Sequence, residues 1–457
     1  MTDSPSTSPP EEKPIPSGLR ARGRLRVPSS KSLTHRYFNL AVLARASIVV
    51  ENPLVAEDTR LFLQALSRFG FRVTDEEGGV RLEPTGPSPP WPPSPIPSRP
   101  PGEGGKGETE IFCGNAGTML RFLVATLTVI PGLWRLDGVP RLRERPVRPL
   151  VDALRRLGAR IDYLGAEGYV PLRLHGGTLG AGATVLDAGE SSQYLSALLM
   201  AALRAPGPVT VEVQSLTSRP YVDVTLGVVA AFGGRIDEDG QSTYRVWPSA
   251  LDVPRVAVEG DWSAAAYPAA AAALTGGTVV LDGLVWDSRQ SDRGFLALLA
   301  EMGAGVSWRG DEVTIDGGIG EGLRGIEADL SSMPDQVPTL AALAPFARGT
   351  TRIFNVAHLR IKESDRLEAM AGELRKAGAT VDEGPDWLRI PGIWADREPP
   401  TDPVRIDPRG DHRIAMSLAL VGLRRPGIVV TAPEVVGKSY PGFWGDLERL
   451  LGRPLTP

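Results

Sequence analysis

Two stretches of the sequence repeat one pattern: "SRQSDRGFLALLAEMGA" at residues 288–304 and "IKESDRLEAMAGELRKAGA" at residues 361–379. Each contains Ser-Asp-Arg, then a helix-length run with apolar residues on one face, then a glycine. Glycine favours the left-handed conformation in which many helices end. The corresponding glycines of six such stretches are Gly70, Gly158, Gly233, Gly303, Gly378 and Gly452. Six copies in phase indicate an internal repeat of about 75 residues.

A second series of helix-length runs, apolar on nearly all sides, alternates with the first. Examples are "YLSALLMAAL" (194–203) and "AAAYPAAAAAL" (264–274), and β-type runs such as "GPVTVEV" follow them. A helix without a polar face must be buried, whereas an amphipathic helix can lie on a surface. Each repeat is therefore predicted to run strand, buried helix, strand, amphipathic helix and two-stranded hairpin. The sequence predicts an α/β fold of two similar domains, each of three βαβαββ units with buried helices.

The domain limits follow from the positions of the repeats. We expect a disordered tail over residues 1–17, a first three-unit domain over 31–258, and a second domain made of 18–30 plus 259–457. Residues 84–108 are rich in proline, as in "PSPPWPPSPIPSRPP". This composition predicts a polyproline-type insertion in the first unit rather than a continuing sheet.

Composition excludes several classes of protein. The 457 residues are 42% hydrophobic with a net charge of −4, and no apolar run reaches the roughly 18 residues that span a bilayer. Cys113 is the only cysteine, and the four histidines lack metal-ligand spacing. We expect a cytoplasmic protein that uses no metal or cofactor and binds neither membrane nor nucleic acid.

Short polar sequences such as "SSKSLTHR" (29–36) and "GNAGTMLR" (114–121) precede the buried helices. Alone, each is explained as a helix cap. Together they predict helix N-termini, with free N–H groups, gathered on one side of the structure, where anions bind. Nine basic residues lie in or beside these loops: Lys31, Arg36, Arg121, Arg145, Arg219, Lys362, Arg366, Arg413 and Lys438. The pattern favours a substrate with several phosphate or carboxylate groups.

Two acidic residues, Asp335 and Glu363, lie among these bases. Each carboxylate can be a structural ion-pair member, and Asp335 can also cap a helix. Carboxylates beside cations can equally transfer protons. Spacing alone leaves these alternatives open.

Nine stretches together resemble the family of 5-enolpyruvylshikimate-3-phosphate synthases. They are "SSKSLTHR", "GNAGTMLR", "RERPVRPL", "SSQYLSALLM", "SRPYVDVT", "MPDQVPTLAALA", "LRIKESDRL", "GDHRIAMSLAL" and "GKSYPGF". The resemblance implies two domains of the inside-out α/β barrel type joined by a double interdomain hinge. It also implies a monomer without a cofactor that transfers the enolpyruvyl group of phosphoenolpyruvate to the 5-hydroxyl of shikimate 3-phosphate, releasing phosphate.

The resemblance carries the family's binding residues to matching positions of this chain. For shikimate 3-phosphate these are Lys31, Ser32, Arg36, Ser191, Ser192, Gln193, Ser218, Tyr221, Asp335, His358 and Lys362. For phosphoenolpyruvate they are Lys31, Asn115, Gly117, Arg145, Gln193, Arg366, Arg413 and Lys438. The implied catalytic residues are Asp335 as proton acceptor, Glu363 as proton donor, and Lys31.

Three positions depart from the family's usual pattern: Ser29, Phe122 and His358, where glycine, proline and asparagine are common. His358 can still donate a hydrogen bond. Gly117 is retained, and the resemblance therefore implies inhibition by glyphosate.

Two rival functions remain from the sequence. A sister enolpyruvyl transferase acts on UDP-N-acetylglucosamine, but it commonly uses a loop cysteine, whereas Cys113 follows a predicted strand and is expected to be buried. A non-catalytic scaffold that uses the PxxP matches of the insertion is the other alternative, although such a protein does not need nine basic residues beside helix starts.

Overall fold

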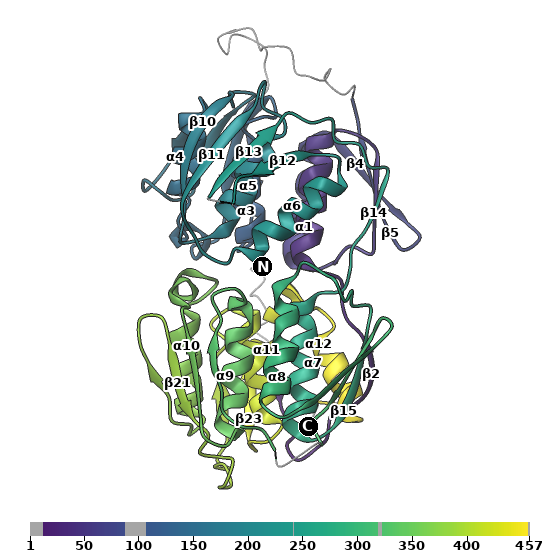
Figure 1. Ribbon diagram of the computed structural model, residues 1–457, viewed down its shortest axis with the longest axis vertical. Coiled ribbons are helices and arrows are strands. Elements are labelled where there is room, and N and C mark those ends of the chain that lie inside the picture. The colour runs from purple at the N-terminus through teal and green to yellow at the C-terminus, as the bar shows by residue number, and fades with distance from the viewer. Residues whose placement is uncertain (1–11, 87–106, 241, 319–321, 456–457) are drawn as a thin grey trace, which may run out of the picture. The chain divides into compact units, whose positions relative to one another are not determined.

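The computed structural model describes residues 12–86, 107–240, 242–318 and 322–455, which fold into two compact units (Figure 1). Unit 1 comprises the described residues of Met1–Val27, Trp262–Leu284 and Asp292–Pro457. Unit 2 comprises those of Pro28–Asp261 and Val285–Ser291. Each unit has its own hydrophobic core.

Unit 2 contains three four-stranded sheets, each with one parallel pair and an antiparallel hairpin. In spatial order the first sheet is β14 (Arg255–Ala257), β3 (Ile48–Glu51), β5 (Gly79–Pro84) and β4 (Phe71–Glu76). The second is β6 (Thr109–Phe112), β7 (Gly132–Asp137), β9 (Leu172–Gly176) and β8 (Arg160–Tyr163). The third is β10 (Gly182–Ala188), β11 (Val209–Leu216), β13 (Thr243–Trp247) and β12 (Arg235–Glu238).

Each sheet of unit 2 is associated with one buried and one amphipathic helix. The buried helices are α1 (Lys31–Ala44), α3 (Gly117–Thr126) and α5 (Ser192–Ala202). The amphipathic helices are α2 (Glu57–Arg68), α4 (Arg148–Arg156) and α6 (Pro220–Ala231), and η1 (Leu142–Glu144) is a 3₁₀ turn. All residues of α5 except Gln193 are buried, because nearly every one is apolar or small.

Unit 1 repeats the plan with two four-stranded sheets and one of three strands. The first runs β16 (Gly305–Arg309), β17 (Glu312–Asp316), β15 (Thr278–Asp282) and β2 (Arg22–Arg26). The second runs β18 (Glu327–Asp329), β19 (Thr350–Phe354), β21 (Leu388–Pro391) and β20 (Asp382–Glu383). The third runs β1 (Glu12–Pro14), β23 (Ile428–Thr431) and β22 (Val404–Ile406).

The helices of unit 1 form the same two series. The buried ones are α7 (Trp262–Thr275), α9 (Val337–Leu343) and α11 (His412–Gly422). The others are α8 (Phe295–Glu301), α10 (Arg366–Lys376) and α12 (Phe443–Leu451). Five 3₁₀ turns join these elements: η2 (Ser291–Gly294), η3 (Pro334–Gln336), η4 (Ala344–Phe346), η5 (Ala357–Ile361) and η6 (Pro433–Lys438).

The repeat predicted from the sequence is confirmed in its helices and their ends. All fourteen residues of α7 are buried, as a helix without a polar face requires. The six helix-ending glycines all have positive φ, between 68° and 109°. They are Gly70, Gly158, Gly233, Gly303, Gly378 and Gly452. Five of the six sheets also show the predicted hairpin beside a parallel pair. In two of these five, one strand of the parallel pair, β14 or β2, comes from elsewhere in the chain.

Three strands join sheets far from their position in the sequence. Strand β2 pairs in parallel with β15, β14 pairs in parallel with β3, and β1 pairs antiparallel with β23. The expectation of a disordered tail over residues 1–17 is therefore wrong for residues 12–14, because the backbone of Glu12, Lys13 and Pro14 is in register with Thr431, Val430 and Val429. Residues 1–11 lie outside the described residues.

The compact units differ slightly from the domain limits expected from the sequence. Residues 28–30 and 259–261 group with unit 2, and so does the segment Val285–Ser291. The proline-rich insertion predicted at 84–108 lies largely outside the described residues: Pro84 still belongs to β5, and Glu108 forms an ion pair with Arg173. Among the described residues, no helix combines the length and apolar character needed to cross a membrane.

Candidate active site

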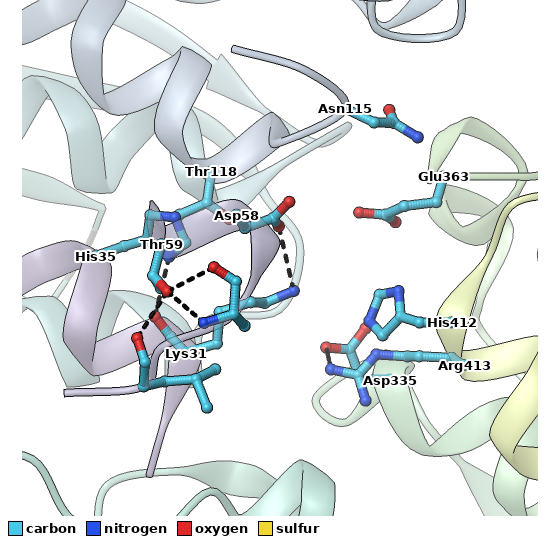
Figure 2. A network of polar contacts seen from close by, with 12 residues as sticks. Lys31, His35, Asp58, Thr59, Asn115, Thr118, Asp335, Glu363, His412 and Arg413 are labelled. Atoms are coloured by element: carbon cyan, nitrogen blue, oxygen red, sulfur yellow. Dashed lines mark hydrogen bonds and ion pairs between the residues drawn. The ribbon is translucent and has the colours of Figure 1, made fainter. Parts of the chain in front are cut away.

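The first turn of α1 carries Lys31 and contains no acidic side chain (Figure 2). Ser30 caps the helix, and its hydroxyl accepts a hydrogen bond from the Leu33 N–H at 3.4 Å. The Lys31 N–H donates to Asp261 Oδ2 at 3.0 Å, and the Lys31 ammonium lies 3.6 Å from Asp58 Oδ2. Lys31 is therefore tethered at both its backbone and its side chain, at the positive end of a helix dipole.

Arg36, one turn further along α1, is 2% exposed and is bound by neutral oxygens. Its guanidinium donates to Thr225 Oγ1 at 2.8 Å, to the Tyr221 carbonyl at 2.8 Å and to the Ser32 carbonyl at 3.0 Å. Burial lowers the pKa of Arg36 to about 10, because the charged form has lost its water. The side chain still carries a positive charge at neutral pH.

A second group in unit 2 forms around the start of α3. Arg145, 3% exposed, donates toward the Asn115 carbonyl at 3.5 Å. A Cβ added to Gly117 would lie 2.6 Å from three atoms of the Arg145 guanidinium. Glycine is thus needed at the first position of α3 for the guanidinium to lie against the helix N-terminus.

The side chain of Gln193 connects α3 to α5. Its amide oxygen accepts from Arg121 at 2.9 Å and its amide nitrogen donates to Thr118 Oγ1 at 2.9 Å. The Gln193 N–H donates to Ser191, which caps α5, at 3.3 Å. These bonds place Ser191, Ser192 and Gln193 together at the N-terminus of α5.

Ser218 and Tyr221 lie at the start of α6. Ser218 is 7% exposed and has φ of 50°, a left-handed conformation that is uncommon for serine and that occurs often at functional sites. Tyr221 contributes its carbonyl oxygen to Arg36. Hydrogen bonds therefore connect Arg36 directly to Ser32 and to Tyr221.

In unit 1, Asp335 lies between two buried arginines, Arg366 and Arg413, of which Figure 2 labels Arg413. Its Oδ1 accepts from Arg366 Nη1 at 2.8 Å and its Oδ2 accepts from Arg413 Nη2 at 2.6 Å. The Asp335 side chain is 24% exposed, whereas those of Arg366 and Arg413 are 2% and 6% exposed. The carboxylate is thus the accessible part of the cluster, fixed from behind by two guanidinium groups.

Arg366 has two further acidic partners. Its Nη2 donates to Glu363 Oε2 at 3.0 Å, and its Nε donates to Asp411 Oδ2 at 2.7 Å. Burial alone would lower the pKa of Arg366, but Asp411, Glu363 and Asp335 together raise it above the ordinary arginine value. We call Asp335, Glu363, Arg366, Asp411 and Arg413 the acid–arginine cluster.

Three other predicted residues belong to unit 1. Burial, reinforced by the charge of Lys362, lowers the pKa of His358 to about 3, so its imidazole is neutral at pH 7. Asp335 and Arg366 also act on the His358 charge, which places the imidazole near the acid–arginine cluster. Lys438 ends η6 and is 4% exposed.

The sequence reasoning missed several residues that hold the predicted ones. Asp411 stands in the quoted "GDHR", where it caps α11 through the Arg413 N–H, but nothing in the sequence showed that it also binds Arg366. Asp58 lies in α2, outside any motif, and pairs with Lys31. Asp261 directly precedes α7, and its Oδ2 accepts from the Lys31 N–H at the start of α1.

The site residues include no metal-ligand set. Across the described ranges, no group of three or more His, Cys, Asp or Glu side chains is arranged to hold a metal ion. What the site offers instead is fixed cations, helix N-termini and two carboxylates held on one arginine.

These features define a class: α/β proteins of repeated βαβαββ units that bind anionic small molecules at the starts of buried helices. The family model described as EPSP synthase (3-phosphoshikimate 1-carboxyvinyltransferase) matches residues 16–447. The chain belongs to the EPSP synthase family.

Curated relatives agree over nearly the whole chain. A 3-phosphoshikimate 1-carboxyvinyltransferase of Syntrophobacter fumaroxidans is 46% identical over 437 residues, covering 95% of this chain and 98% of the relative. One of Ralstonia pickettii is 40% identical, covering 93% and 96%. A solved structure of EPSP synthase from Acinetobacter baumannii has a TM-score of 0.76 at 27% identity, covering 96% of this chain and 98% of that one.

Proposed function

We propose that this protein transfers the enolpyruvyl group of phosphoenolpyruvate to the 5-hydroxyl of shikimate 3-phosphate and releases inorganic phosphate, a reaction of the shikimate pathway to chorismate and aromatic amino acids. Membership of the EPSP synthase family supports this activity. The observation that carries the assignment of roles is Asp335, held between Arg366 and Arg413 with Glu363 on the same Arg366.

Residues of unit 2 are proposed to bind shikimate 3-phosphate. Arg36 is bound by neutral oxygens, so its charge is available to a phosphate dianion. The N-terminus of α5, with its caps, supplies hydroxyl and N–H donors. The residues assigned here are Lys31, Ser32, Arg36, Ser191, Ser192, Gln193, Ser218 and Tyr221, and Asp335, His358 and Lys362 of unit 1 are assigned to the same substrate.

Phosphoenolpyruvate is proposed to use the remaining cations. Arg366 and Arg413 present planar guanidinium groups suited to a carboxylate, and Arg145 lies at the start of α3 beside Asn115 and Gly117. Lys31, Gln193 and Lys438 complete this set. A substrate carboxylate that binds the two arginines of unit 1 shares them with Asp335 and Glu363, and thereby makes both acids more basic.

The proposed chemistry is addition followed by elimination. Asp335 takes the proton of the 5-hydroxyl as the hydroxyl oxygen bonds to C2 of phosphoenolpyruvate. At the same time Glu363 delivers a proton to the C3 methylene of phosphoenolpyruvate. The tetrahedral intermediate then returns a C3 proton to the Glu363 carboxylate as the C–O bond to phosphate breaks, which restores the double bond, and the phosphate leaves with the proton held by Asp335. Lys31 and the arginines stabilise the negative charge of the phosphate throughout.

The first experiment measures phosphate release by the purified protein with both substrates, alongside Asp335→Ala and Lys31→Ala. We expect release that both substitutions reduce by at least about 10²-fold. Asp311→Ala, which removes an exposed carboxylate of the same unit in the turn between β16 and β17, serves as the matched control and should keep the parent's rate. Absence of release from the parent protein would reject the proposal.

The rival activity uses UDP-N-acetylglucosamine as the acceptor, and the burial of Cys113 argues against it. The thiol is fully buried directly after β6, and burial raises its pKa well above the usual value, so it is not a nucleophile. Cys113→Ala should therefore keep its rate with shikimate 3-phosphate within about twofold. A loss greater than tenfold would favour the cysteine-dependent rival.

Three finer expectations belong to the same proposal: a cytoplasmic location, a monomeric state, and inhibition by glyphosate. Gly117 against Arg145 supports the last, since this is the proposed phosphoenolpyruvate position. Competition of glyphosate with phosphoenolpyruvate in the phosphate-release assay tests inhibition, and light scattering during size-exclusion chromatography tests the monomer.

A further inference from the structure

A short segment, Val285–Ser291, belongs to unit 2 although the chain on both sides of it belongs to unit 1. Within this segment the side chain of Gln290 is directed inward and is 8% exposed. Arg289 packs against Gly227 of α6, where an added Cβ would lie 2.7 Å from Arg289 Cδ. The segment is therefore anchored to the rest of unit 2 at its C-terminal end, through Arg289 and the buried Gln290, whereas Val285 and Trp286 are exposed.

The Gln290 side chain uses all of its hydrogen-bonding groups. Its amide nitrogen donates to Glu259 Oε1 at 2.8 Å and to the Gly260 carbonyl at 2.9 Å, and its amide oxygen accepts from Ser30 Oγ at 3.1 Å. Ser288 Oγ donates to the same Glu259 oxygen at 2.5 Å and accepts from the Gln290 N–H at 3.1 Å. We call these five residues, Ser30, Glu259, Gly260, Ser288 and Gln290, the Gln290 clasp.

The clasp acts on the first turn of α1. Ser30 is the residue that caps this helix, and its backbone N–H donates to the Glu259 carbonyl at 2.8 Å. Ser29 and Gly260 form an isolated antiparallel bridge beside it. The next residue of the helix is Lys31, whose N–H is held by Asp261. Three separated segments thus meet where α1 begins, and one buried amide joins them.

We propose that Gln290 is a positioning residue for Lys31. This inference rests on the proposed function, in which Lys31 contacts both substrates. Without the amide, the buried Ser30 hydroxyl loses its acceptor, the buried Gly260 carbonyl loses a donor and Glu259 keeps only Ser288, which removes the bonds that join these segments and loosens the start of α1. Because a shift of about 1 Å in a positioning group can cost on the order of 10²-fold in rate, a looser first turn reduces the contribution of Lys31.

Hydrogen exchange tests the clasp without any assay of activity. Gln290→Met keeps the length and unbranched shape of the side chain but removes its three hydrogen bonds. We expect exchange at the amides of Ser30, Lys31 and Leu33 to become at least about tenfold faster, with no change at the start of α5. Thr184→Val is the matched control, because it removes one buried hydrogen bond of unit 2, to the Ala153 carbonyl, away from α1. Unchanged exchange in Gln290→Met, or the same acceleration in Thr184→Val, would overturn the proposal.

Titration calorimetry with shikimate 3-phosphate tests whether the clasp acts through Lys31. Gln290→Met should raise the dissociation constant by about tenfold in the parent protein but by less than about twofold in a Lys31→Ala background. An equal increase in both backgrounds would show that Gln290 affects binding independently of Lys31 and would reject the positioning role. Failure of the parent protein to bind shikimate 3-phosphate would reject the proposed function, whereas the exchange measurement would still decide whether Gln290 holds the first turn.

Discussion

Arg36 of unit 2 and Arg366 of unit 1 are equally buried, at 2% exposure, yet their surroundings are opposite. The described hydrogen-bond partners of Arg36 are a hydroxyl pair and two carbonyls, whereas Arg366 binds the carboxylates of Asp335, Glu363 and Asp411. Burial lowers the pKa of Arg36, and the acids outweigh burial and raise the pKa of Arg366. The two units thus hold the same kind of side chain in different helices, α1 and α10, and surround it with different partners.

The difference separates two tasks. A guanidinium held by neutral oxygens keeps its full charge for an incoming phosphate. A guanidinium held by carboxylates is neutralised, but it fixes acids that can accept and donate protons. From this comparison we propose that the acids of proton transfer lie in unit 1 and that Arg36 and the start of α5 in unit 2 serve binding of the phosphate substrate.

The largest expected effect sharpens that division through steady-state kinetics. Asp335→Asn and Glu363→Gln keep the size of the side chain but remove the proton-carrying carboxylate, so kcat should fall by about 10²–10⁴-fold with modest change in KM. Ser191→Ala at the start of α5 should instead raise KM for shikimate 3-phosphate by about tenfold and leave kcat within a few fold. If Ser191→Ala lowered kcat as much as Asp335→Asn, the division of tasks would be wrong.

The two arginines should also differ in their effect on stability. Arg366→Met leaves Asp411, which is 0% exposed, without its counter-ion and should lower the free energy of unfolding by about 3–5 kcal/mol. Arg36→Met removes a buried charge together with hydrogen bonds to neutral oxygens and should cost only about 1–2 kcal/mol. Urea denaturation followed by circular dichroism gives both values. Equal losses would contradict the contrast in partners.

Two buried histidines with lowered pKa, His35 of unit 2 and His358 of unit 1, predict an acid-sensitive stability. Burial lowers the pKa of His35 to about 4, and that of His358 is lowered to about 3. Unfolded histidine titrates near 6.5, so between these values the unfolded chain binds more protons and stability falls as pH drops. The free energy of unfolding falls between pH 7 and pH 5, and His35→Gln should make that fall smaller by about 1–2 kcal/mol, as measured by urea denaturation at both pH values. The same substitution at the partly exposed His175 of β9 is the control, and an unaltered slope in His35→Gln would contradict the prediction.

The smallest expected effect concerns the start of α3. In Gly117→Ala the new methyl group would lie 2.6 Å from the Arg145 guanidinium, so that side chain must move away. KM for phosphoenolpyruvate should rise by roughly fivefold to tenfold, while KM for shikimate 3-phosphate changes little. Gly445→Ala in α12, where no other atom lies within 4 Å, is a control that should change neither value. If only the KM for shikimate 3-phosphate rose, Arg145 would bind that substrate rather than phosphoenolpyruvate, and the prediction would be wrong.

Much of the fold could be predicted because its signals are local and repeated. Burial of α7 follows from its run of alanines, and the end of α10 follows from Gly378. The strand pairings of β1, β2 and β14 could not be predicted, because no local pattern says that Glu12 will lie opposite Thr431. Short strands that complete distant sheets are specified by tertiary packing rather than by their own residues.

The residues of the candidate site likewise fall into those that the sequence identified and those that it did not. Residues within motifs, such as Lys31 and Arg366, were identified because motif and helix start coincide. Asp58, which pairs with Lys31, and Gln290, which binds the Ser30 cap, were not identified, since an ordinary polar residue in an amphipathic helix or loop gains its role only from what the fold places beside it. The assignment of each residue to a substrate stays a prediction.

The exchange of strands between distant parts of the chain has a consequence for synthesis. Strands β1 and β2 are made early, but their partners β23 and β15 are translated several hundred residues later. Domains generally fold as units while the chain emerges from the ribosome. Unit 2, whose residues end at Ser291, can therefore assemble while β1 still lacks its partner β23, and unit 1 can close only after Thr431 has been added. The half of the molecule that holds the acid–arginine cluster is in this way the last to form.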